Sequence, residues 1–205
     1  LAHEYLESGQ PEQARRVADE GWSRLQGAGA LMELSVLRLA TARAWILVQS
    51  AEPAEAMETV KRGLSLVSDH PDLLFIRGCA QEMLGLMDED ASARQSFFLA
   101  AADSYEEALS KEGTLFLQKF VQGCTSWAAH VRIGTVHLLR NNAEGALKHF
   151  ELALQIKESC EEAEWGRVEC WIRSGDIVQA IRHVQQVHGK TKPDSDAVAQ
   201  RAVPA

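Results

Sequence analysis

Histidines are the first residues of this chain whose chemistry and spacing suggest a site. His130 and His137 lie seven residues apart, which places both on one face of a helix, and His183 and His188 lie five apart. Imidazole nitrogens are common zinc ligands, but a zinc site needs three or four protein ligands in a defined geometry. The sequence offers no evident third partner for either pair. We therefore expect no metal site.

Carboxylates form a second group of candidate ligands. Glu158, Glu161, Glu162 and Glu164 follow one another closely, which could suggest cation binding. The last three also fall where a helix is expected to begin, and the positive end of a helix dipole stabilises carboxylates in the first turn. We interpret this run as a first turn, and residues 88–90 as a solvated loop.

Catalytic sequence motifs are missing. The chain contains no phosphate-binding G-x-x-x-x-G-K-S/T, no dinucleotide-binding G-x-G-x-x-G, no zinc-protease H-E-x-x-H and no hydrolase G-x-S-x-G. Each of these patterns positions the groups that a reaction needs, so their absence argues against the corresponding enzymes. We expect no enzymatic activity, no catalytic residue and no cofactor.

Cysteine usage indicates a reducing environment. Cys79, Cys124, Cys160 and Cys170 form no C-x-x-C pair, and a chain of 205 residues that is 46% hydrophobic can build a core without disulfides. A free cysteine behaves as a small apolar residue and is commonly buried. We expect four reduced, mostly buried thiols and a cytoplasmic protein.

Net charge limits the possible partners. The chain has 21 basic and 29 acidic residues, a net charge of -8, and its basic residues form no stripe. Nucleic acids and anionic membranes bind positively charged surfaces, so neither is expected as the main partner. No apolar run approaches the roughly 20 residues that cross a bilayer.

The spacing of apolar residues predicts the elements that position any site. Only 6% of the residues are aromatic, and Ala, Leu, Glu and Gln are plentiful, which favours helices. Between residues 134 and 153 the small and apolar positions advance in steps of three and four, with a single step of five across an Asn-Asn turn. This pattern predicts a helical hairpin. Its positions are Gly134, His137, Asn141, Ala146, Phe150 and Ala153.

The same steps recur along the chain. One copy lies 34 residues further on, two precede it, and a fourth is interrupted by an insertion. The positions are Val168, Trp171, Gly175, Ala180, Val184 and Val187; Ala2, Tyr5, Gly9, Ala14, Ala18 and Gly21; Ala44, Leu47, Ala51, Ala56, Val60 and Gly63; and Gly78, Gln81 and Gly85 followed by Ala101, Tyr105, Ala108 and Leu109. Five hairpins predict an all-α chain, an α-solenoid of stacked antiparallel helical hairpins.

This unit resembles the tetratricopeptide repeat family, in which a helix-turn-helix of about 34 residues carries small and aromatic residues at these positions. His130 and Glu164 depart from the pattern because they stand where the family usually has tryptophan. Successive post-turn alanines lie 42, 45, 45 and 34 residues apart, so other helical solenoids with longer periods are the structural alternative. We expect a solenoid over 1–188, with repeats near 1–25, 37–66, 71–110, 127–160 and 161–188, and a mobile tail over 189–205.

The resemblance implies that the first helix of each unit lines a concave groove. Two tryptophans and a phenylalanine among few charges suggest apolar anchors for an extended or helical peptide. The family's lysine and asparagine clamp for acidic C-termini is missing at the matched positions. The expected binding residues are Thr41, Trp45, Val48, Phe75, Cys79, Glu82, Val131, Thr135, Leu138, Trp165, Glu169 and Ile172.

These features predict a scaffold that binds a protein or peptide without catalysis. An exposed contact patch near Leu115 to Val121 is a further hypothesis, beside the interpretation of that insertion as a packed helix extension. In rhythm the chain also resembles the repeat tail that follows the catalytic domain of some bacterial family 2 glycosyltransferases. That alternative implies part of a larger enzyme, inactive alone. A start at Leu1 inside a helix leads us to expect excision from a longer protein, which is compatible with either hypothesis. The partner and the oligomeric state stay open.

Overall fold

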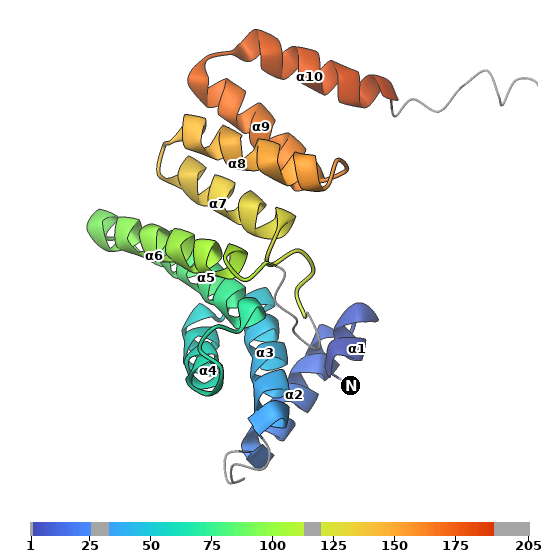
Figure 1. The fold of residues 1–205 in the computed structure, drawn as a ribbon, viewed down its shortest axis with the longest axis vertical. Coiled ribbons are helices and arrows are strands. Elements are labelled where there is room, and N and C mark those ends of the chain that lie inside the picture. The colour runs from blue at the N-terminus through green and yellow to red at the C-terminus, as the bar shows by residue number, and fades with distance from the viewer. Residues whose placement is uncertain (1, 26–32, 113–119, 191–205) are drawn as a thin grey trace, which may run out of the picture.

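The computed structural model describes residues 2–25, 33–112 and 120–190, and each regular element in these ranges is an α-helix. Figure 1 shows the helices stacked in chain order from α1 and α2 at one end to α9 and α10 at the other. This is the all-α solenoid that the sequence predicts. The helices are α1 (Ala2–Glu7), α2 (Pro11–Leu25), α3 (Glu33–Gln49), α4 (Pro53–Leu66), α5 (Pro71–Met87), α6 (Ala91–Leu109), α7 (Trp127–Leu139), α8 (Ala143–Ile156), α9 (Glu161–Ser174) and α10 (Ile177–Lys190).

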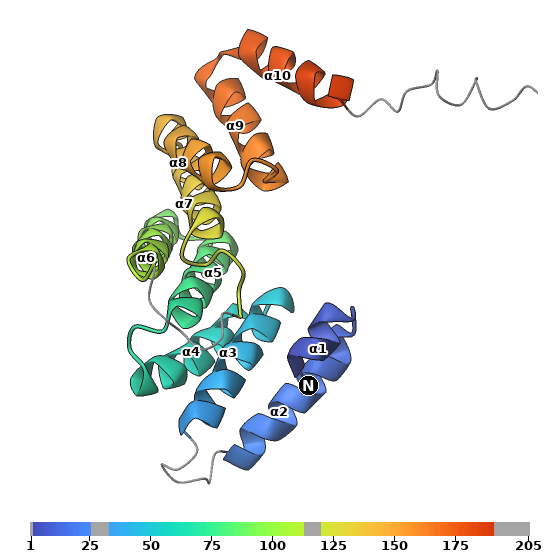
Figure 2. The ribbon, with the colours of Figure 1, turned by 45° about the vertical axis from the view of Figure 1, so that its right-hand side comes forward.

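Each helix packs on the next one in the chain, and α3, α5, α7 and α9 also pack on one another in sequence. The view in Figure 2 shows the same order along an elongated body. Since the odd-numbered helices touch across successive hairpins, they form a continuous row, which we call the odd-helix row.

The turn inside four of the hairpins has one backbone conformation. Its central residue has φ between 59° and 85°, the left-handed region, and ends the first helix of the hairpin. In the last hairpin the Gly175 N–H donates to the Ile172 carbonyl at 3.1 Å, and the Asp176 N–H donates to the Trp171 carbonyl at 2.8 Å. The equivalent central residues are Gly9, Ala51, Asn141 and Gly175.

The third hairpin replaces this turn. Gly85 lies inside α5, which continues to Met87, and Asp90 starts α6 by accepting a hydrogen bond from the Ala93 N–H at 2.7 Å. An added Cβ on Gly85 would come within 2.7 Å of the Phe98 ring, so this glycine serves close packing of α5 on α6. Gly85 stands at the repeat position that Gly9 and Gly175 occupy in their hairpins, but it allows close helix packing, whereas those two residues form the turn.

Small residues bring α7 and α9 close to α8, and the spacing predicts such a close approach at Gly134. An added Cβ on Gly134 would lie 2.8 Å from the Phe150 ring, and one on Gly166 would lie 2.5 Å from it. Phe150 therefore fills the space between α7, α8 and α9, and it is buried. The alanine at the equivalent repeat position in the second helix is buried in every hairpin; these residues are Ala14, Ala56, Ala101, Ala146 and Ala180.

All four cysteines are buried free thiols, as expected from the sequence. No helix in the described ranges is long and apolar enough to cross a membrane. Leu115, Phe116, Leu117 and the part of the expected tail beyond residue 190 lie outside the described residues. The division into repeats and tail stays a prediction.

Candidate functional site

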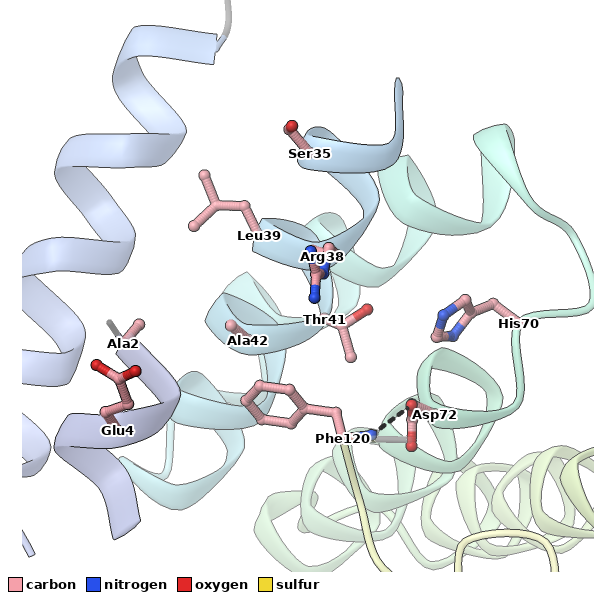
Figure 3. A pocket seen from close by; sticks show the side chains of 10 residues that line it. All are labelled: Ala2, Glu4, Ser35, Arg38, Leu39, Thr41, Ala42, His70, Asp72 and Phe120. Atoms are coloured by element: carbon pink, nitrogen blue, oxygen red, sulfur yellow. Dashed lines mark hydrogen bonds between the residues drawn. The ribbon is translucent and has the colours of Figure 1, made fainter. Parts of the chain in front are cut away.

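A cavity of about 540 Å³ lies between α1, α3 and the start of α5 (Figure 3). Its walls come from the odd-helix row, from the residue that precedes α5 and from the segment that leads into α7. Charged, polar and apolar side chains all contribute, so it suits a ligand of mixed character. The lining residues are Ala2, Glu4, Ser35, Arg38, Leu39, Thr41, Ala42, His70, Asp72 and Phe120.

Figure 3 shows how these side chains lie. Arg38 and Thr41 project from α3, the ring of Phe120 extends towards Ala42, and His70 lies on the α5 side. Burial lowers the pKa of His70, although the carboxylates of Asp72 and Asp69 oppose that effect. The cavity thus combines one aromatic wall with ionisable groups from three helical segments.

Asp72 fixes the segment that leads into α7. Its Oδ2 accepts a hydrogen bond from the Phe120 N–H and its Oδ1 accepts one from the Val121 N–H, both at 2.9 Å, and the Cys124 thiol lies 3.3 Å from Oδ1. A buried carboxylate needs such donors to offset its lost hydration. Asp72 therefore ties this segment across α5 and places Phe120 in the cavity wall.

The twelve residues expected to line a groove fall into three classes of exposure. Six are buried: Thr41, Val48, Phe75, Cys79, Glu82 and Leu138. Four are partly exposed: Trp45, Val131, Thr135 and Glu169. Trp165 and Ile172 are exposed, at 50% and 47% of their surface. Thr41 lines the cavity, but the binding role of all twelve stays a prediction.

The three expected residues on α5 lie against neighbouring helices. The rings of Phe75 and Tyr105 are 5.3 Å apart, and the Tyr105 hydroxyl donates to Glu82 at 2.8 Å. Arg132 on α7 approaches Glu82 at 3.4 Å. Burial raises the pKa of Glu82, while Arg132 and the Tyr105 hydroxyl act in the opposite direction. Burial also raises the pKa of Cys79 to about 11, which keeps it a thiol. This network joins α5, α6 and α7.

At the far end of the row, α9 keeps two of the expected positions accessible. Trp165 and Ile172 lie seven residues apart and are both about half exposed. Glu169, between them, forms an ion pair with Arg173 at 2.7 Å. The most exposed of the expected groove residues are thus this apolar pair on α9.

His130 and His137 both contact His149 on α8, whereas His183 lies in the last hairpin. Nε2 of His183 lies 2.6 Å from Oε2 of Glu164, and the side chain of His188 lies outside the described part. His130 lies 3.1 Å from His149. His149 is on α8, so the spacing of histidines within one helix could not indicate this contact. Within residues 2–25, 33–112 and 120–190, no group of three or more His, Cys, Asp or Glu residues has the geometry of a metal site.

Solved structures with the same architecture cover nearly the whole chain. A thermophilic tetratricopeptide repeat protein from Thermus thermophilus, TTC0263, superposes with a TM-score of 0.71 at 13% identity, over 98% of this chain and 93% of that one. The protein MamA superposes with a TM-score of 0.63 at 15% identity, over 93% and 94% of the two chains. The chain has the tetratricopeptide repeat fold.

A further tetratricopeptide repeat protein, from Parabacteroides merdae ATCC 43184, superposes with a TM-score of 0.64 at 16% identity, over 94% of this chain and 65% of that one. No protein-family model matches the sequence, and a search of curated proteins finds no relative. At these identities the likeness concerns the fold alone. The resemblance to glycosyltransferase tails stays a prediction.

Proposed function

We propose that this chain is a non-catalytic scaffold that binds a peptide or a partner protein along its odd-helix row. The observation that carries the proposal is the cavity between α1, α3 and α5, because helices from three hairpins contribute to one concave site. Its mixture of ionisable groups and one aromatic wall matches the side-chain variety of a polypeptide. Similar folds in tetratricopeptide repeat proteins support this reading.

The apolar pair Trp165 and Ile172 is the second part of the proposed site. Tryptophan is enriched among residues that dominate binding energy, because it buries a large area with few rotatable bonds. Trp165 is half exposed and lies on the same row of helices as the cavity. A partner that follows the row would place an apolar side chain on this pair and polar groups in the cavity.

The test begins with peptides selected from a displayed library on the immobilised chain. The tightest peptide is then titrated calorimetrically against Ser35→Trp, which places a large ring in the cavity, and against Trp165→Ala. Ser35 is exposed, so the substitution leaves the core intact. We expect Trp165→Ala to weaken binding by about 2 kcal/mol, the scale of an aromatic hot spot, and Ser35→Trp to weaken it comparably.

Ile156→Ala is the matched control. Ile156 is 52% exposed, much like Trp165, but lies on α8 outside the odd-helix row. Thermal melts first establish that all variants are folded. Full affinity in both Ser35→Trp and Trp165→Ala, with loss in Ile156→Ala, would move the binding surface to the even-numbered helices.

A further inference from the structure

The α7–α8 hairpin gathers three histidine side chains, two from α7 and one from α8. Nδ1 of His130 lies 3.1 Å from Nδ1 of His149. The ring of His137 stacks on that of His149, with centroids 5.5 Å apart and planes inclined by 25°. All three side chains are partly exposed, so small solutes reach them from solvent. His149 is held between two rings, which restricts its orientation.

We propose that His130 and His149 clamp one divalent transition-metal ion, preferentially Cu²⁺, between their Nδ1 atoms. A metal about 2.0 Å from each nitrogen would bind two atoms 3.1 Å apart at an angle of about 100°. That angle suits neighbouring ligands in a tetragonal or tetrahedral site. Cu²⁺ accepts nitrogen ligands in tetragonal geometry and has the highest affinity among the divalent first-row metals. Water completes the coordination of this two-ligand site.

The protonation states of the two rings are compatible with this role. A hydrogen bond between the two Nδ1 atoms requires that one of them carries a proton and the other accepts the hydrogen bond. Binding requires that proton to move to Nε2 of the same ring, which leaves both Nδ1 lone pairs for the metal and releases no proton from the protein. Burial and the neighbouring histidines lower the pKa of His149 to about 4, and burial lowers the pKa of His130. Both shifts favour the neutral imidazole, the form that binds metals.

The charged side chains near the three histidines are more often negative than positive, which favours a bound cation. Glu112, which follows α6, acts electrostatically on His130, and Glu106 on α6 acts on His137. Arg140 at the end of α7 is the positive group that acts on His137. Two carboxylates and one guanidinium thus act on the ring cluster. Because the two proposed ligands come from different helices, a bound metal would also link α7 to α8 and raise the melting temperature.

The experiment titrates the full chain with Cu²⁺ at neutral pH by calorimetry, with electron paramagnetic resonance to detect bound imidazole nitrogen. All samples carry His3→Gln, because a histidine two residues after a free amino terminus itself chelates Cu²⁺. We expect one Cu²⁺ per chain and a heat of binding that is independent of the buffer's ionisation enthalpy. His130→Gln and His149→Gln should each weaken binding about tenfold or more, since even loss of a group supporting a ligand has that effect.

His183→Gln is the matched control, because His183 is a partly exposed histidine that pairs with Glu164 in another hairpin. It should leave the affinity unchanged. Unaltered affinity in His130→Gln or in His149→Gln would overturn the clamp, since both nitrogens are required. If either variant folds poorly, the chain that keeps both histidines provides the test. In that chain Cu²⁺ should protect His130 and His149, and not His183, from carbethoxylation mapped by mass spectrometry. Equal modification with and without Cu²⁺ would refute the site.

Discussion

The hairpins α5–α6 and α9–α10 differ in how far their neighbours cover them. Eleven of the seventeen residues of α5 are buried, because α3, α4, α6 and α7 all pack on that helix. Ala180 is the one buried residue among the described side chains of α10, which packs on α9. Ile177, Val178 and Ile181 of α10 are exposed instead.

The repeat pattern accounts for the formation of each hairpin, whereas neighbouring helices determine how much of the hairpin is buried. Glycine and alanine spacing is enough to close each hairpin, since both hairpins form. Burial of the remaining faces requires helices on each side, as in any stack in which a unit contacts mainly its neighbours. The central hairpin also contains a buried polar network, whereas the last hairpin presents apolar surface. Stability should therefore be concentrated in the centre of the chain.

The largest expected effect is at the centre. Tyr105→Ala removes a fully buried ring that contacts Phe75, and it leaves Glu82 without the hydroxyl donor. We expect a loss of about 3 to 5 kcal/mol in the free energy of unfolding, measured by urea titration followed by circular dichroism. Leu99→Ala on the same helix is the control, because Leu99 is exposed and should cost little. Comparable losses in the two variants would contradict the burial of Tyr105.

Overpacking tests whether the two hairpins resist strain equally. Ala146→Leu and Ala180→Leu replace equivalent buried alanines, one in α8 between α7 and α9, the other in α10. We expect Ala146→Leu to destabilise by about 1 to 3 kcal/mol, with Ala180→Leu at the lower end, because α10 can shift away from its single neighbour. Chemical unfolding of both variants gives the comparison. A larger effect at Ala180 would show that α10 is held more firmly than its contacts indicate.

Acid should act on α7–α8 through its histidines. The pKa of His149 is lowered to about 4 by burial and by His130 and His137, so the folded state binds this proton less readily than the unfolded chain. The resulting stability is complete above about pH 6.5, the ordinary histidine pKa, and is lost as the pH falls towards 4. Solvent screening of a half-buried ring reduces it to about 1 to 2 kcal/mol.

His149→Gln isolates this contribution from the carboxylates that titrate in the same range. Unfolding free energies of the parent and the variant, measured at pH 7 and at pH 4.5, give the two slopes. The variant should lose less stability on acidification than the parent. Parallel pH profiles would show that His149 keeps its proton affinity on folding.

The repeat and its hairpins could be predicted because their signals are local. Gly134, Ala146 and Phe150 follow helical spacing, and the structure places the two small residues where Phe150 needs room. The turn residues Gly9 and Gly175 were likewise visible as breaks between helical steps. Short-range backbone chemistry and close packing determine these features, so they leave a regular trace in the sequence.

Long-range contacts in the candidate site left no such trace. Asp72 follows Pro71 like any carboxylate of a first turn, yet its hydrogen bonds go to residues 48 to 52 positions later. The repeat pattern could not indicate that Phe75 and Glu82 would be buried against α6 and α7. His149 was equally inconspicuous, because its partner His130 lies on another helix. Such contacts depend on how hairpins stack, which periodicity does not encode.

A smaller effect is expected at the shared turn. Ala51 and Gly175 occupy the same left-handed position, but alanine is strained there because its Cβ approaches the backbone. Ala51→Gly should therefore stabilise the chain by about 0.5 kcal/mol, and Gly175→Ala should destabilise it by about 1 kcal/mol. Beyond Gly175 and its two chain neighbours, no atom lies within 4 Å of the added Cβ, so the loss would report the local backbone alone. Thermal melts resolve both signs, and equal signs would contradict this assignment.

The smallest expected effect is on the exposed face of α10. Val178 is 65% exposed, so Val178→Ser removes little buried area and should change the free energy of unfolding by about 0.5 kcal/mol or less. Urea titrations of the parent and the variant at two protein concentrations provide the measurement. If the stability of the parent rises with concentration and Val178→Ser abolishes that rise, this face is covered in solution by a second copy of the chain. A loss without concentration dependence would instead mean that α10 packs more closely within one chain than its exposure indicates. Either result would mean that α10 is covered more like α5 than its exposure in a single chain indicates. If neither is observed, the exposed face of α10 contributes little to stability, in contrast to the buried faces of α5.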